Sequence, residues 1–237
     1  MTPNLCSRLH PLSLVVIPVL SLMCLPGCGT SESRPSPLEE AAAVGDPSRI
    51  LGLVQRGMDP NSLGPDRIAP LAVAARSGQI ASIRALIEAG ADPDLRDDRN
   101  GWTPLLHAVH KHQKRSIEAL LALGADPDRG TRAGYTPLMM AAGYGYPETV
   151  RLLLEHGADP RLTQRSGENA LLMAATGSFD IDRFTLGQCQ AETVRALLEH
   201  DPALSIPDTP LARLEFQLVK LRRCEEVLAL LEQRREP

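Results

Sequence analysis

Three histidines, His107, His110 and His112, lie within six residues of one another. Imidazole nitrogens are common zinc ligands and common general acids or bases, so this group is the first place to look for chemistry. A closed zinc site needs four ligands, and the sequence around these histidines supplies no cysteine and no nearby carboxylate to complete one. We therefore expect no metal site here, and we expect His110 and His112 to be surface residues of a helix.

Motifs that mark common enzyme classes do not occur in the sequence. It contains no G-x-S-x-G nucleophile turn, no H-E-x-x-H zinc motif and no glycine-rich phosphate loop, and its acidic residues are scattered. We therefore expect a protein that is not an enzyme and has no cofactor. The alternative is a hydrolase or metalloprotein with a site under a stretch of extra residues at 176–190.

Cys28 is the residue whose sequence context points to covalent modification. It ends the sequence Leu25-Pro26-Gly27-Cys28, which closes an uncharged apolar run that begins at Leu12. A run of this length is typical of a secretory signal peptide and is too short to span a bilayer. The four residues resemble the lipobox of bacterial lipoproteins, although proline departs from the small or β-branched residue usual at its position. The resemblance implies that Cys28 is acylated; cleavage near Gly29, with a soluble product, is the alternative.

The N-terminal sequence predicts three parts of the chain. Residues 1–27 are the predicted signal peptide, residues 28–36 are the lipidated cysteine with a polar, proline-bearing tether that will not fold, and residues 37–237 are the folded domain. By analogy with the sorting of enterobacterial lipoproteins, Gly29 after the cysteine favours the outer membrane. We expect a protein that faces the periplasm and touches the membrane only through its lipid; the alternative is a soluble periplasmic protein.

The other cysteines suggest a disulfide. Cys6 and Cys24 would leave with the signal peptide and Cys28 would carry lipid, so Cys189 and Cys224 remain. In an oxidising compartment an isolated pair is more often bridged than free. A Cys189–Cys224 disulfide is one prediction, and two small buried thiols are the other.

A repeated pattern runs through most of the sequence. Its fullest copy is Gly101-Trp102-Thr103-Pro104-Leu105-Leu106-His107-Ala108. Its proline position recurs at residues 37, 70, 104, 137, 170 and 210, with gaps of 33, 34, 33, 33 and 40. A period of 33 carrying T-P-L-H-x-A resembles the ankyrin-repeat family, over roughly residues 36 to 235. The resemblance implies an all-α repeat solenoid of about five to six repeats with atypical end caps. Each repeat would be a helix-turn-helix with a β-hairpin finger, and His107 would be a hydrogen-bonding structural residue.

Local signals agree with this fold. Thr103 and Thr136 can cap a first helix, and glycines at 57, 90, 124 and 157 can end each second helix. The third repeat has one extra residue in its finger. The fifth has roughly eleven extra residues within 176–190, and we expect its finger to be lost.

Charge and composition narrow the class of partner. The net charge of −4 gives no indication of nucleic acid binding. Aromatic residues are only 3% of the chain, as expected for a thin core between stacked helices rather than a thick globular one. We expect a monomer that binds a protein.

The family resemblance implies a partner-binding surface on the finger tips and the exposed residues of each first helix. Transferred to this chain, the surface comprises Arg76, Arg99, Trp102, His110, Lys111, Arg132, Tyr135, Tyr144 and Arg165. Stacked helices lie about 8 to 10 Å apart, so the three tip arginines would form a row roughly 20 Å long. Arginine, tryptophan and tyrosine are enriched at interface hot spots, which favours binding of an acidic, partly apolar protein surface. The alternative is that the arginines are solvated and idle.

Overall fold

The computed structural model describes residues 34–177, 190–209 and 224–232. The helices of this part are α1 (Pro37–Val44), α2 (Pro47–Gln55), α3 (Pro70–Ser77), α4 (Ile80–Glu88), α5 (Pro104–His110), α6 (Lys114–Ala122), α7 (Pro137–Tyr144), α8 (Pro147–Glu155), α9 (Ala170–Thr176), α10 (Ala191–His200) and α12 (Glu225–Glu232). The described residues contain no strand. The predicted signal peptide, Cys28 and most of the tether lie outside them.

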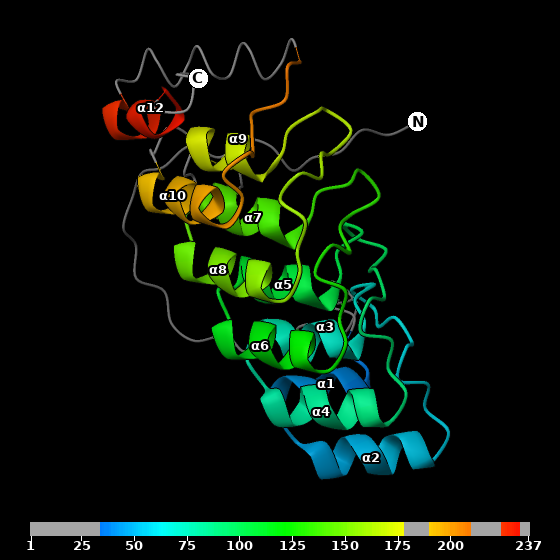
Figure 1. The fold of residues 1–237 in the computed structure, drawn as a ribbon. Helices are drawn as coiled ribbons and strands as arrows, with labels where there is room; N and C mark the ends of the chain where they lie inside the picture. The colour runs from blue at the N-terminus through cyan, green and yellow to red at the C-terminus, as the bar shows by residue number, and fades with distance from the viewer. Residues whose placement is uncertain (1–33, 178–189, 210–223, 233–237) are drawn as a thin grey trace, which may run out of the picture. The chain divides into compact units, whose positions relative to one another are not determined.

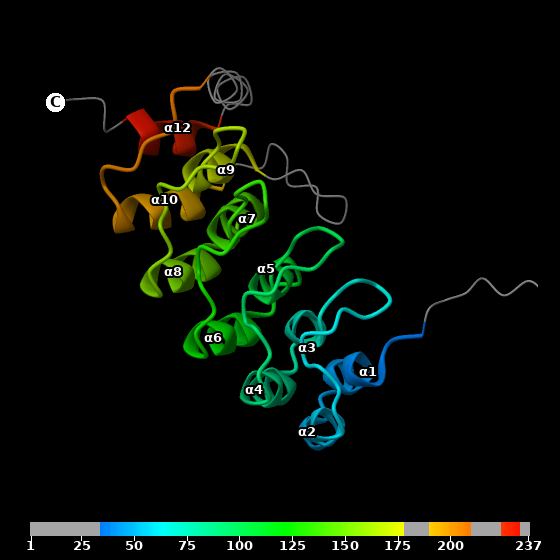
Figure 2. The same ribbon diagram turned by 90° about the vertical axis from the view of Figure 1, so that its right-hand side faces the viewer.

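The helices form pairs that stack into two rows. Helices α1, α3, α5, α7 and α9 form an inner row, and α2, α4, α6, α8 and α10 lie beside it as an outer row (Figures 1 and 2). The long loops that connect successive pairs leave from the same side of the stack, on the right in Figure 1. This arrangement confirms the predicted all-α repeat solenoid.

The inner helices begin where the sequence predicts. The Thr103 hydroxyl accepts a hydrogen bond from Leu106 N at 3.3 Å, and Thr136 does the same for Met139 N at 3.2 Å. Each cap satisfies one of the amides that a helix start leaves without a partner, and the proline that follows has a backbone angle suited to the first turn. The predicted caps are confirmed. The first repeat lacks the threonine, but Ser36 replaces it in a reciprocal capping box with Glu39.

The core is the seam between the two rows of helices. Leucines of the inner helices, including Leu105 and Leu138, are fully buried, and so are apolar residues of the outer helices such as Ile83 and Ile117. Alanine pairs at the same position of the inner helices are at most 2% exposed, because their small side chains let neighbouring inner helices approach. The predicted glycine ends of the outer helices are also confirmed, with φ between 87° and 94° at residues 57, 90, 124 and 157.

The fingers, predicted as β-hairpins, are loops in which one or two backbone hydrogen bonds close each tip. Three tips have a short turn bond, from Arg67 N to Gly64 O, Gly134 N to Thr131 O and Gly167 N to Gln164 O, at 2.8 to 2.9 Å. So few bonds per loop are too little pairing to form a strand. The bond that closes each tip joins Gly64 N to Ile68 O, Asp97 N to Trp102 O, Thr131 N to Tyr135 O and Gln164 N to Glu168 O, at 2.9 to 3.1 Å. The bond of the third repeat spans one residue more than the others, which places the predicted extra residue in the tip.

A ladder of side-chain acceptors joins the bases of neighbouring fingers. The backbone N–H of Asp92 donates to Asn61 Oδ1 at 2.8 Å. The equivalent amides of Asp126 and Asp159 donate to the carboxylates of Asp94 and Asp128, each at 3.0 Å. Burial raises the pKa of Asp94 and Asp128, and the ladder hydrogen bonds, which lower the pKa, offset that rise only in part. In the fifth repeat, whose finger was predicted to be lost, the base turn survives: Ala203 N donates to Asp201 Oδ1 at 3.0 Å.

Candidate partner-binding surface

We call the finger loops, together with the side of the inner helices that they flank, the finger face. Arg99, Arg132 and Arg165 are exposed at its tips. Neighbouring loops touch there: Arg165 N donates to Ala133 O at 2.9 Å, and Asp98 N donates to Arg67 O at 3.1 Å. No hydrogen bond or ion pair engages the three tip guanidinium groups within the described part of the chain. Their predicted exposure is confirmed, and their role in binding stays a prediction.

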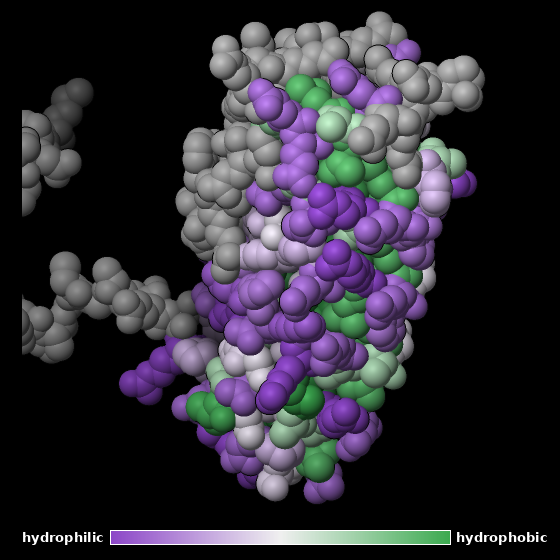
Figure 3. Space-filling view, turned by 60° about the vertical axis from the view of Figure 1, so that its left-hand side comes forward, coloured by the Kyte–Doolittle hydropathy of each residue, from purple (hydrophilic) through white to green (hydrophobic). Residues whose placement is uncertain are grey.

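Some charged residues of the outer helices form ion pairs with the next repeat. Lys114 of α6 pairs with Glu148 of α8 at 2.7 Å, and Arg195 of α10 pairs with Glu226 of α12 at 2.7 Å. Figure 3, in which the left side of Figure 1 comes forward, shows hydrophilic side chains spread along the repeats with hydrophobic ones between them. Lys114 and Arg195 are thus paired between repeats, whereas the tip arginines have no such pair within the described residues.

Below the tips, Arg96 links two fingers. Its Nε donates to the carbonyl of Gly130, in the next finger, at 2.7 Å. Burial lowers the pKa of the Arg96 guanidinium, and the positive charges of Arg129 and Arg132 lower it further. The repeat pattern of the sequence did not predict Arg96 or Arg129 as surface-site residues, because both lie below the finger tips.

Asp97 and His107 form a buried pair. His107 Nε2 lies 2.7 Å from Asp97 Oδ2, and the two side chains are 7% and 1% exposed respectively. The other carboxylate oxygen, Oδ1, accepts three backbone N–H bonds at 2.7 to 3.2 Å, from Asn100, Gly101 and Trp102. Burial alone would raise the pKa of Asp97, but the hydrogen bonds from His107 and the backbone outweigh it, so the pKa lies below its ordinary value.

The pair corrects one expectation and agrees with another. The sequence indicated no carboxylate near the histidines, and this was wrong, because the third finger folds back so that the Asp97 carboxylate lies 2.7 Å from His107. The structural, hydrogen-bonding role implied for His107 is the one it has. Among the described residues no group of three or more histidine, cysteine, aspartate or glutamate side chains is placed to hold a metal ion.

The aromatic residues of the finger face pack against one another. The Trp102 ring lies 5.3 Å from His107 and 4.9 Å from His110, measured between ring centroids. His110 Nδ1 lies 3.0 Å from the Tyr144 hydroxyl, and His110 and Tyr144 are only 6% and 5% exposed. The prediction that these two are surface residues is therefore wrong: large rings at this position reach across neighbouring repeats and bury one another.

The remaining predicted surface residues differ in exposure. Lys111 is exposed and so is His112, as expected, although the His112 ring also lies 4.0 Å from Tyr146. Arg76, Trp102 and Tyr135 are half-buried, and both aromatic rings contact the core. The surface that the sequence predicted as one row is thus an exposed arginine edge with partly buried aromatic side chains behind it.

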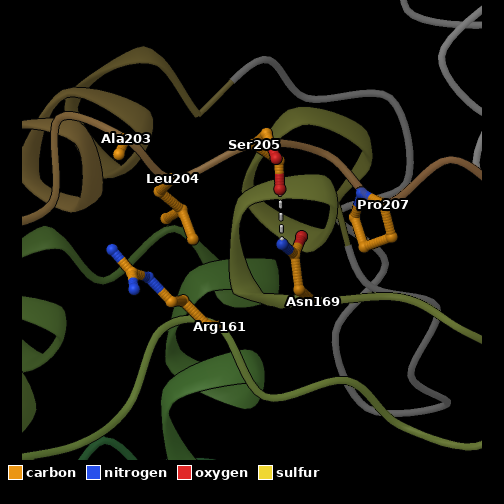
Figure 4. A pocket seen from close by; sticks show the side chains of 6 residues that line it. All are labelled: Arg161, Asn169, Ala203, Leu204, Ser205 and Pro207. Atoms are coloured by element: carbon orange, nitrogen blue, oxygen red, sulfur yellow. Dashed lines mark hydrogen bonds between the residues drawn. The ribbon is translucent and has the colours of Figure 1, made fainter.

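Two shallow pockets lie among the described residues. One, of about 240 Å³, lies between the finger that enters the fifth repeat and the loop that follows α10 (Figure 4). There Arg161 pairs with Asp201 at 2.7 Å, and Asn169 Nδ2 donates to the Ser205 carbonyl at 2.8 Å. The other, of about 280 Å³, lies between the second finger, α1 and α3, with Val44 and Arg76 among its lining residues. Both are smaller than the roughly 300 to 1,000 Å³ typical of small-molecule sites.

Cys224 is 5% exposed and is disulfide-bonded. All other cysteines of the chain, Cys189 included, lie outside the described residues. Its pairing with Cys189 stays a prediction. Most of the stretch at 176–190, which was the alternative place for a hydrolase or metal site, also lies outside the described part.

Comparison with known families gives two matches. A model of ankyrin repeats in three copies matches residues 38–131, and a second ankyrin-repeat model, built for many copies, matches residues 120–174. Together they span residues 38–174, more than half of the 237 residues. A search of curated protein sequences found no significant match.

Proposed function

Because this chain belongs to the ankyrin-repeat family, whose repeats mediate interactions between proteins, we propose that it binds a protein partner through its finger face. The observation that carries the proposal is the row of tip arginines. Three guanidinium groups stand on successive fingers, exposed and without a partner in the described residues, whereas Lys114 and Arg195 of the outer helices are paired between repeats.

The chemistry of the finger face specifies the partner. Unpaired guanidinium groups favour carboxylates, which they can bind through two parallel hydrogen bonds, so the partner surface is acidic. Trp102 and Tyr135 add a half-buried apolar area behind the arginines. The partner surface is therefore also partly apolar. Scaffolding of several proteins and inhibition of one protein both use such a face, and the identity of the partner decides between them.

Reversal of the tip charges is expected to slow binding. Charges at the rim of an interface mainly steer association, and salt screens their effect. In the double variant Arg99→Glu and Arg165→Glu, the association rate at low salt should fall on the order of tenfold, and by less at 0.5 M salt. The partner is first recovered by affinity purification and mass spectrometry, and the rates are then measured by surface plasmon resonance.

The double variant Arg84→Glu and Arg115→Glu is the matched control for this experiment. Arg84 and Arg115 are exposed arginines of the outer helices α4 and α6, away from the fingers, so their reversal changes the net charge by the same amount without changing the finger face. Equal slowing by the control and by the tip variant would mean that only the net charge matters, and binding by the finger face would then be wrong.

We further propose that the domain is held at the periplasmic side of the outer membrane by lipid on Cys28. The sequence from Leu25 to Cys28 and the polar tether after it support this placement. None of the described helices is long and apolar enough to cross a membrane.

Cys28→Ser tests the anchor. Several acyl chains hold a protein to a membrane at about 0.8 kcal/mol per buried CH₂ group, so the wild type should fractionate with membranes until detergent is added. The variant should appear in the soluble fraction or accumulate as an unprocessed precursor. A wild-type protein that is soluble without detergent would exclude the lipid anchor and leave the alternative of ordinary cleavage near Gly29.

A further inference from the structure

Arg96 is held in place by the fold rather than by an acidic partner. Its Nε–H is fixed on the Gly130 carbonyl at 2.7 Å, which ties the third finger to the fourth. The side chain is half-buried, and its terminal N–H groups have no acceptor among the described residues. A guanidinium group presents five N–H donors in a rigid plane, so an Arg96 anchored through Nε still offers its other donors to a ligand.

Two more arginines gather around Arg96. Arg129 and Arg132, on the fourth finger, flank Gly130, whose carbonyl holds Arg96 Nε, and are near enough for their positive charges to act on Arg96. The carboxylate of Asp94 acts on Arg96 in the opposite direction. Neither Arg129 nor Arg132 forms an ion pair within the described residues.

The acidic groups nearest in the sequence are already engaged. Asp94 Oδ1 accepts the amide of Asp126 at 3.0 Å, and the buried Asp97 is occupied by His107 and three backbone amides. Asp98 pairs with Arg67 at 2.9 Å. Asp128, beside Arg129 in the sequence, accepts the amide of Asp159 at 3.0 Å. None of these carboxylates forms an ion pair with Arg96, Arg129 or Arg132 within the described residues, so three like charges stand together without a direct partner. Such an arrangement costs free energy, and a bound anion relieves that cost.

We propose that Arg96, Arg129 and Arg132 form a binding site for one doubly charged oxyanion group, either a phosphate monoester or two adjacent carboxylates. Both groups offer the oxygen pairs that guanidinium forks recognise, and three arginines suit a group that carries more than one negative charge. This site goes beyond the proposed function, because it requires no protein partner and adds Arg96 and Arg129, below the tips, to the tip residue Arg132.

Two small probes test the site and distinguish its ligand: capped phosphoserine and a capped Asp-Asp dipeptide, both dianions at pH 7.5. Binding to the purified full chain is measured by calorimetry and by fluorescence of Trp102, the only tryptophan, with sodium chloride at equal ionic strength as the blank. Saturable binding of the phosphoserine probe alone would identify a phosphate site, and binding of both probes would identify a site that takes carboxylate pairs as well. Binding of neither probe above the chloride blank would overturn the proposal.

Variants then assign the site to its residues. Arg96→Gln and Arg129→Gln should each weaken binding about tenfold, because each removes a charge-assisted contact. Arg161→Gln is the control, since Arg161 is a finger arginine already paired with Asp201. Protonation of the phosphate below its second pKa of about 6 should also weaken binding at pH 5. If Arg96→Gln and Arg129→Gln, both folded by circular dichroism, bind as tightly as the Arg161→Gln control, the three arginines are not the site.

Discussion

Asp97→Ala is expected to lower the free energy of unfolding by about 3 to 5 kcal/mol, because a group left without its buried hydrogen-bond partner typically costs about 1 to 3 kcal/mol and this change affects several. The Asp97 carboxylate is 1% exposed and accepts hydrogen bonds from His107 and from three backbone amides. The variant leaves all four donors in the third finger without their acceptor. Urea denaturation followed by circular dichroism measures the loss.

The neighbouring residue supplies the control. Asp98 forms only an exposed ion pair with Arg67, so Asp98→Ala should cost less than about 1 kcal/mol. The pH dependence adds a second check. Because the folded protein lowers the pKa of Asp97, the stabilisation is present above the unfolded value of about 3.9 and is lost as the pH falls through the lower folded value. The gap between wild type and variant should therefore narrow below about pH 4. If Asp97→Ala lowers the free energy of unfolding no more than Asp98→Ala does, Asp97 does not stabilise the third finger as proposed.

Leu105→Ala and Leu138→Ala are expected to cost about 2 to 5 kcal/mol each. Both leucines are fully buried in inner helices, α5 and α7, at the seam between the two rows. Truncation removes packing on both sides of the seam and leaves a cavity that rigid neighbouring helices cannot close. Thermal and urea denaturation of each variant measure the effect.

Leu162→Ala provides the same chemical change at the surface, because Leu162 is a finger residue that is 37% exposed. It should alter stability by less than about 1 kcal/mol. Equal losses at Leu162 and Leu105 would show that the seam does not hold the repeats together. Tyr144 does not serve as a surface control, since it is buried and its hydroxyl lies 3.0 Å from His110 Nδ1.

The period of the sequence predicted the repeats, the helix caps and the exposed tips, because these depend on residues close together in the chain. Thr103 caps a helix that starts at the next residue, and the tip arginines follow from their position in the finger. What sequence reasoning missed depends on contacts between fingers or across repeats. Arg96 reaches Gly130, 34 residues away, and His110 reaches Tyr144, also 34 residues away. Asp97 meets His107, ten residues away, through the fold of the third finger, which the period of the sequence does not describe.

The ladder at the finger bases has a consequence for how such a protein can change length. Acceptors stand at 61, 94 and 128 and donors at 92, 126 and 159, so each bond joins equivalent positions of successive repeats. Deletion of residues 94–127 would place Asp128 where Asp94 stood, with the amide of Asp159 still facing it. Gene rearrangements that remove one whole period therefore leave no amide of the ladder without an acceptor, and an extra residue in a finger tip, as in the third repeat, also leaves the ladder intact.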